Sequence, residues 1–144
     1  MKGKKKARKL TVDEMPVLKK AMEILSNRED RLNLGACMVS NNILTGAGQL
    51  RWCYRHEPYR GSDVDNGWEF LSDIDTEEFL NIAENWSIIS FDQMAIIEPC
   101  VVKIFDFPPG TDLVVIDDGD NRYFADSETF APVLRYCPDE EDEQ

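Results

Sequence analysis

The segment that decides the fold is QLRWCYRHEPYRGSDVDNGWEFL, residues 49–71. Apolar and polar side chains alternate over residues 49–55, and residues 67–71 also have the composition of a strand. Both segments are therefore predicted to be β-strands. Residues 56–66 between them are polar and contain a proline and a glycine, as connecting loops commonly do. We expect two paired strands joined by a long loop.

Strand alternation also predicts which side chains of the second strand are buried. Trp68 and Phe70 are two residues apart, so they point to one face of the sheet, and Glu69 points to the other. We expect Trp68 and Phe70 in the core and interpret them, with Gly67, as a structural motif. The alternative is an exposed Trp68 that acts as a binding anchor.

Further strand segments extend the sheet. Residues 35–40 read as a buried strand, and Asn41-Asn42 after them is a turn signal, which predicts an antiparallel hairpin with residues 49–55. A clearer hairpin is predicted between residues 113–116 and 122–124. Residues 86–91 are expected to form another strand.

Helical signals are fewer. Thr11 and Glu14 have the spacing of a capping box, which predicts a helix beginning at Thr11. Its apolar positions recur at helical intervals: Met15, Leu18, Met22 and Leu25. Asp75 and Glu78 have the same capping spacing and predict a short helix over residues 76–83, and residues 92–97 predict a helical turn.

These elements define an α+β fold: an antiparallel sheet of hairpins with an N-terminal helix and one or two short helices. The 144 residues are the size of one domain. We expect residues 1–10 to be a disordered basic tail, residues 11–137 a single α+β domain, and residues 138–144 an acidic tail.

Charge is unevenly distributed along the chain. The net charge is -12, yet residues 1–10 carry only basic charges. Beyond Gly61 the basic residues are Lys103, Arg122 and Arg135, against a large excess of Asp and Glu. The folded body should therefore repel nucleic acid and attract a basic protein partner.

The sequence favours a cytoplasmic protein without membrane contact. No apolar run approaches the roughly 20 residues of a membrane helix, and the basic start is not followed by the apolar segment of a signal peptide. Cys37 and Cys53 lie in strand-like runs and are expected to be buried free thiols, as in a reducing compartment. The other two cysteines are Cys100 and Cys137. No two of the four have the C-x-x-C spacing typical of a zinc site.

Signals for chemistry are weak. His56 is the only histidine and no nucleophile elbow accompanies it. The aspartates around Gly119 do not have the spacing of a calcium loop and are better explained as a hairpin turn. Another acidic group is expected at a helix N-terminus: Asp73, Asp75, Glu77 and Glu78. We predict no catalytic residue, no metal site and no cofactor, and hence a protein that is not an enzyme.

The loop between the two central strands is the predicted binding surface. It is longer than the 2–5 residues usual between paired strands, and it carries aromatic and arginine side chains of the kind that dominate binding hot spots. The candidate partner-binding residues are Arg55, Glu57, Tyr59, Arg60, Asp63 and Asp65.

Four blocks of sequence resemble a known family. They are Gly35-Ala36-Cys37-Met38-Val39-Ser40, Tyr54-Arg55-His56-Glu57-Pro58, Asp65-Asn66-Gly67-Trp68-Glu69-Phe70 and Pro109-Gly110-Thr111. In this order they resemble the immunity proteins of bacterial polymorphic-toxin systems, number thirty-three in that naming and formerly a domain of unknown function. The resemblance covers about residues 34–124. His56 stands where the family has an acidic residue, and Asn66 where it has serine.

The resemblance implies an α+β domain that neutralises a toxin by binding it in the cytoplasm, with no catalytic residues to transfer. The partner is expected to be a protein, with a basic toxin domain as one candidate and a second copy of the chain, as a homodimer, as another. Two alternative functions stay open: a general protein-interaction or regulatory module without a toxin partner, and a small enzyme.

Overall fold

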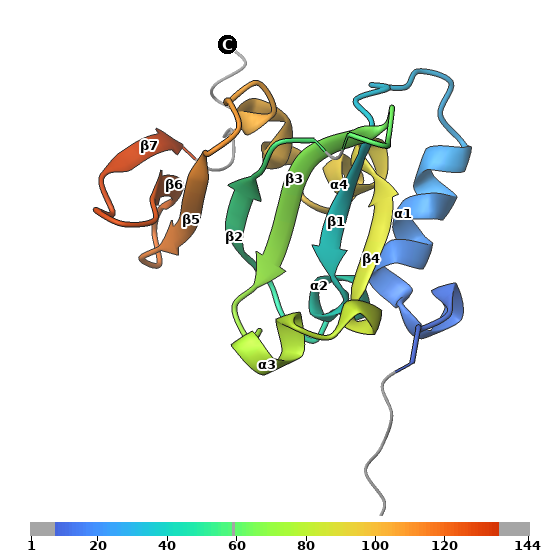
Figure 1. Cartoon of the computed structure of the whole chain (residues 1–144). Coiled ribbons are helices and arrows are strands. Elements are labelled where there is room, and N and C mark those ends of the chain that lie inside the picture. Colours follow the sequence, from blue (N-terminus) through green and yellow to red (C-terminus); the bar gives the residue numbers. More distant parts are fainter. Residues whose placement is uncertain (1–7, 59, 136–144) are drawn as a thin grey trace, which may run out of the picture.

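The computed structural model describes residues 8–58 and 60–135, and Figure 1 shows the chain as a twisted sheet with helices packed behind it. The strands are β1 (Ala36–Ser40), β2 (Leu50–Arg55), β3 (Asp65–Ser72), β4 (Trp86–Ser90), β5 (Asp112–Asp117), β6 (Arg122–Asp126) and β7 (Pro132–Arg135). The α-helices are α1 (Pro16–Ser26), α2 (Asn41–Thr45), α3 (Glu77–Leu80) and α4 (Phe91–Ile97). Three 3-10 helices complete the fold: η1 (Val12–Glu14), η2 (Ala83–Asn85) and η3 (Pro99–Ile104).

The seven strands form one sheet in the order β4-β1-β3-β2-β5-β6-β7. All neighbouring strands are antiparallel except β1 and β3, which run parallel. The predicted α+β class, with a mostly antiparallel sheet, an N-terminal helix and short helices, is confirmed. The pairing of β2 with β3 and the hairpin of β5 with β6 are confirmed as well.

The predicted hairpin between residues 35–40 and 49–55 is wrong, because β3 lies between β1 and β2. The signal at Asn41-Asn42 is the first turn of α2 and not a tight turn. The Ser40 side chain caps this helix by accepting a hydrogen bond from the Asn42 N–H (3.2 Å). With Ile43 and Leu44 buried, α2 carries the chain across the end of the sheet and leaves the place beside β1 to β3.

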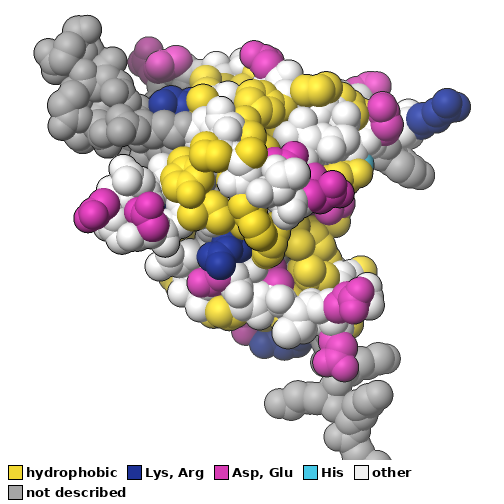
Figure 2. Space-filling view, turned by 90° about the vertical axis from the view of Figure 1, so that its left-hand side faces the viewer, with side chains coloured by type: hydrophobic (Ala, Val, Ile, Leu, Met, Phe, Trp, Pro, Cys, Tyr) yellow, Lys and Arg dark blue, Asp and Glu magenta, His cyan; other side chains and the backbone are white. Residues whose placement is uncertain are grey.

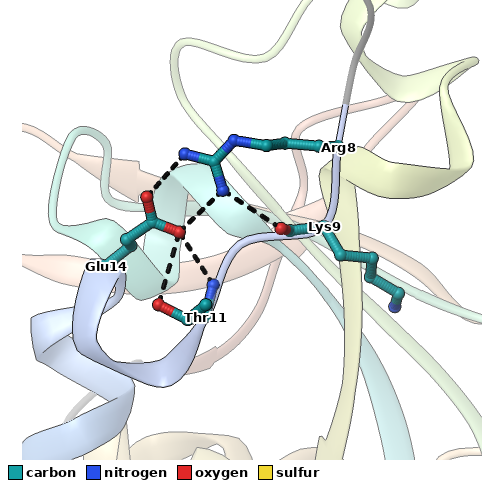
Figure 3. A network of polar contacts seen from close by, with 4 residues as sticks. All are labelled: Arg8, Lys9, Thr11 and Glu14. Carbon is teal, nitrogen blue, oxygen red and sulfur yellow. Dashed lines mark hydrogen bonds and ion pairs between the residues drawn. The ribbon is translucent and has the colours of Figure 1, made fainter.

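The N-terminal helix forms in two pieces. Glu14 accepts hydrogen bonds from the Thr11 N–H (2.9 Å) and hydroxyl (3.3 Å), which confirms the capping box, but the cap belongs to η1, and α1 begins anew at Pro16. Arg8 also binds the Glu14 carboxylate (2.9 and 2.6 Å; Figure 3). The Arg8 hydrogen bond, followed by that of Thr11, lowers the pKa of Glu14 to about 2.

The prediction for the helical face that packs on the core is confirmed at Met15 and Leu18 but is wrong at Met22, and Leu25 is half-buried. Met15, Leu18 and Ala21 are buried, whereas Met22 is 38% exposed. Ala21 takes the inward position, on the side of α1 that contacts α4. Of the predicted N-terminal tail, residues 1–7 lie outside the described residues, and Leu10 packs against the core.

The predicted cap at Asp75 is also wrong. The helix there is short, Glu77–Leu80, and its cap is Thr76, whose side chain accepts from the Phe79 N–H (3.1 Å). The Asp75 carboxylate turns to the sheet instead. It accepts from the Ser72 N–H (2.7 Å), the Ser40 hydroxyl (2.9 Å) and the Asn42 side-chain amide (2.7 Å). Asp75 therefore ties the ends of the two parallel strands together.

The core lies between the sheet and the layer of α1, α4 and η3. Trp68 and Phe70 are fully buried, with stacked rings whose centroids are 5.8 Å apart, which confirms their predicted burial. Cys37 and Cys53 are buried free thiols, as predicted, and Cys100 is buried too. Cys137 lies outside the described residues. Trp52, on the other face of the sheet, is 37% exposed.

The turn between β5 and β6 has the chemistry expected of its aspartates. The Asp117 carboxylate accepts from the Gly119 N–H (3.0 Å). The Asp118 carboxylate accepts from the N–H groups of Asp120 (3.2 Å) and Asn121 (2.9 Å). These are Asx-type contacts that close the turn.

We expect Trp68→Ala to lower the free energy of unfolding by about 3–5 kcal/mol, because it leaves a large cavity beside Phe70. Urea unfolding followed by circular dichroism measures this loss. Trp52→Ala on the neighbouring strand is the matched control and should cost about 1 kcal/mol or less. A Trp68→Ala protein as stable as the control would show that the indole contributes little to the core.

Candidate binding surface

The residues at the end of β2 and the start of β3 are held by the Arg55 guanidinium. Its Nε donates to the Asn66 carbonyl (2.9 Å), and Nη1 donates to the carbonyls of Phe105 and Phe107 (2.8 Å each). The same group lies over the rings of Trp68 (5.7 Å) and Phe105 (5.1 Å). The guanidinium thus bonds to two other segments of the chain and is directed inward.

The backbone of Arg55 makes further contacts with the segment before β5. The Gly110 N–H donates to the Arg55 carbonyl (2.6 Å), and the Arg55 N–H donates to the Thr111 carbonyl (2.9 Å). The YRHEP block and the PGT block of the sequence therefore meet in space. Each block completes the hydrogen bonding of the other.

The third block, at the start of β3, has its own geometric requirement. Gly67 has φ +87°, and a Cβ there would lie 2.1 Å from the His56 carbonyl oxygen. Only glycine fits such a close approach. Asn66 donates from its side chain to the Leu34 carbonyl (2.9 Å) and accepts from the Trp68 N–H (2.9 Å). Gly67, Trp68 and Phe70 are all buried at this point of β3.

The loop between β2 and β3 contains the other predicted binding residues. Glu57, Arg60 and Asp63 are exposed. Asp65, at the start of β3, is half-buried, and its carboxylate accepts from the Gly67 N–H (2.9 Å). Tyr59 lies outside the described residues. The partner-binding role of Arg55 and of these loop residues stays a prediction.

A groove runs beside this loop. It lies on the face of the sheet opposite to α1 and α4, the face that is turned to the viewer in Figure 1. Its volume is about 530 Å³. The lining residues come from β1, β3, β4 and the loop: Ala36, Cys37, Met38, His56, Ser62, Val64, Asp65, Glu69 and Ile88. Ile88 is 71% exposed and Val64 59% exposed, so the walls of the groove present apolar surface to solvent.

A histidine–carboxylate pair lies in this groove. The His56 Nε2 is 3.3 Å from the Glu69 carboxylate, and the His56 Nδ1 is 2.7 Å from the Glu57 carbonyl oxygen. A carbonyl oxygen only accepts, so Nδ1 carries a proton. Burial raises the pKa of Glu69, an effect that His56 opposes and Asp65 reinforces.

Cys37 borders the same groove but is not an activated nucleophile. Its side chain is buried, and desolvation raises the pKa of the thiol far above its ordinary value. The reactive form of cysteine is the thiolate, which this environment disfavours. Among residues 8–58 and 60–135, no cluster of three or more His, Cys, Asp or Glu side chains is arranged to hold a metal ion.

The contribution of the sheet face to this surface was not predicted from the sequence. Met38 and Ile88 are directly paired across β1 and β4, and Met38 is paired with Glu69 across β1 and β3. A signal was present at Ile88-Ile89, where two neighbouring isoleucines in a strand must face opposite sides. One of them, Ile89, is buried, and Ile88 is exposed.

A second apolar area lies at the other end of the sheet. Figure 2 shows hydrophobic side chains gathered in the middle of the face beside β5, β6 and β7, with acidic side chains spread around them. Phe130, just before β7, and Val133, within it, are 56% and 43% exposed. Basic side chains are sparse on this face (Figure 2), in keeping with the acidic composition of the chain.

The class of protein follows from comparison with known families. The sequence pattern described as the immunity protein Imm33 domain matches residues 37–128, close to the span of the resemblance seen in the sequence. The chain therefore belongs to the Imm33 family of immunity proteins. No curated protein and no solved structure matches the chain. In the described part of the chain, every helix is too short or too polar to cross a membrane.

Arg55→Lys should lower the free energy of unfolding by about 1.5–3 kcal/mol. The lysine ammonium donates from a single nitrogen, so it cannot reproduce the hydrogen bonds that Nε and Nη1 make to separate carbonyl groups, and it cannot stack flat on two rings. Urea unfolding measures this loss as a lower midpoint concentration. The slope of the unfolding free energy against urea concentration should change little. Arg51→Lys, at an exposed position of the same strand, is the control. An Arg55→Lys midpoint equal to that of the control would show that these contacts do not stabilise the fold.

Proposed function

We propose that this protein neutralises a toxin by binding to it in the cytoplasm, without catalysing a reaction, and that the loop joining β2 to β3 lies in the interface. The observation that carries the proposal is the match of residues 37–128 to the immunity protein family. Immunity implies a toxin as partner, and stoichiometric binding is the simplest way for a small domain to inactivate one.

The loop suits a protein interface for two physical reasons. Its ends are held rigidly by Arg55 and Gly67, so the exposed residues between them are presented on a fixed frame. A surface held in place before binding loses less conformational entropy on association. The exposed Glu57, Arg60 and Asp63 also offer charged contacts on its rim.

Charge supports a basic partner. With a net charge of -12, the protein should attract a cationic toxin surface over several ångströms and accelerate the encounter. The same charge opposes the association of two copies of this chain. A basic toxin is therefore favoured here over a homodimer.

Co-expression tests the proposal. Any toxin gene found next to the gene for this chain is expressed in a susceptible host, alone and together with the full-length immunity protein. We expect growth to be rescued and the two proteins to co-purify. Loss of growth despite soluble expression of both would contradict the proposal, and a protein partner without toxic activity would favour a general interaction module.

Two substitutions test the role of the loop once the toxin is purified. Asp63→Lys should slow association mainly at low ionic strength, because rim charges act by long-range attraction. Tyr59→Ala should speed dissociation, because aromatic anchors act after contact is made. Surface plasmon resonance at two salt concentrations measures both rates.

Asp120→Lys, which makes the same charge change at an exposed position of the distant β5–β6 turn, is the matched control. Its effect on association should be smaller than that of Asp63→Lys. Unchanged rates for both loop variants, with the proteins still folded, would place the interface elsewhere.

A further inference from the structure

The sheet face that carries the groove is uncovered and partly apolar. Helices α1 and α4 lie on one side of the β4-β1-β3-β2 part of the sheet, and no helix in the described part of the chain crosses the opposite side (Figure 1). Side chains on that side are exposed although large and apolar, above all Ile88 at 71%. Such a surface gains free energy when another molecule covers it.

The groove combines these apolar walls with a carboxylate. Met38 and Ile88 come from adjacent strands, Val64 from the end of the loop, and Glu69 from β3. The contact from Glu69 to His56 is 3.3 Å, longer than the roughly 2.7–2.9 Å of a well-formed charge-assisted hydrogen bond. A carboxylate has about four acceptor positions, so Glu69 retains the capacity to accept a stronger donor.

The charges around the groove determine whether it favours a cationic or an anionic ligand group. Residues 56–69 contain four carboxylates (Glu57, Asp63, Asp65 and Glu69) against one arginine, Arg60. Arg55, which precedes them, directs its guanidinium to interior carbonyl groups. An anionic ligand would be repelled, and a cationic group would be attracted.

We propose that the groove binds a lysine or arginine side chain of the toxin, with its alkyl part against Met38, Val64 and Ile88 and its cationic group beside Glu69. Long basic side chains bury an apolar stem while the charged end stays hydrated or paired, which matches this arrangement of walls and carboxylate. The groove volume of about 530 Å³ is sufficient for one such side chain. This inference rests on the proposed function for the identity of the partner.

The binding chemistry can be tested without the toxin. The full-length protein, with ¹³C-labelled methionine and isoleucine methyl groups, is titrated with N-acetyl-arginine methylamide or with its neutral analogue N-acetyl-norleucine methylamide. We expect the arginine amide to shift the methyl signals of Met38 and Ile88 saturably. It should bind roughly three- to fivefold more tightly than the norleucine amide, as expected of one partly exposed ion pair.

Substitutions assign the preference to Glu69. Glu69→Gln should abolish the preference for arginine over norleucine, whereas Glu77→Gln on α3 should leave it unchanged. Ile88→Lys places a positive charge at an exposed rim position and should weaken binding of the arginine amide more than that of the norleucine amide. The Ile88→Lys variant therefore tests the preference of the groove for a cationic ligand even if Glu69→Gln does not fold. No shift at Met38 and Ile88, or an arginine preference that survives Glu69→Gln, overturns the proposal.

Growth rescue then separates this inference from the proposed function. If the wild-type protein rescues growth and Glu69→Gln and Ile88→Lys rescue it equally well at limiting expression, the groove is not where the toxin binds and the inference fails alone. If the groove binds the arginine amide as expected but the wild-type protein does not rescue growth, the proposed function fails and the assignment to a toxin side chain fails with it.

Discussion

The hydrogen bonds from the Arg55 guanidinium to backbone carbonyl groups connect the central segments of this fold. They join β2 to the start of β3 and to the segment after η3, up to 52 residues further along the chain. Each carbonyl would otherwise require water or another donor in a partly buried place. The backbone of Arg55 adds two hydrogen bonds to Gly110 and Thr111, so side chain and main chain act on the same junction.

This junction also determines the shape of the surface. Arg55 and Gly67 anchor the two ends of the loop, and Glu57, Arg60 and Asp63 are exposed between them. At the other end of the parallel strands β1 and β3, the Asp75 carboxylate accepts hydrogen bonds from both Ser40 and Ser72 and so connects the two strand ends. The groove, which includes Glu69, lies on the part of the sheet between the Arg55 contacts and the Asp75 contacts.

Much of the local structure could be predicted from the sequence. The burial of Trp68 and Phe70 follows from a period of two, the β5–β6 turn from its aspartates and glycine, and the Thr11–Glu14 box from a three-residue spacing. The ordered family blocks likewise led to the immunity protein family, which the match over residues 37–128 confirms. All of these are properties of neighbouring residues, or of ordered motifs, that are written directly in the chain.

By itself, then, the sequence determined the α+β class, the strand faces, the acidic charge and the family. Only the tertiary structure decided that β3 lies between β1 and β2, that Asp75 braces the sheet and does not cap a helix, and that Met38, Glu69 and Ile88 share one groove. The physical reason is that strand neighbours and shared surfaces depend on contacts between residues far apart in the chain. Local periodicity specifies which face of a strand is buried, but not which strand lies beside it.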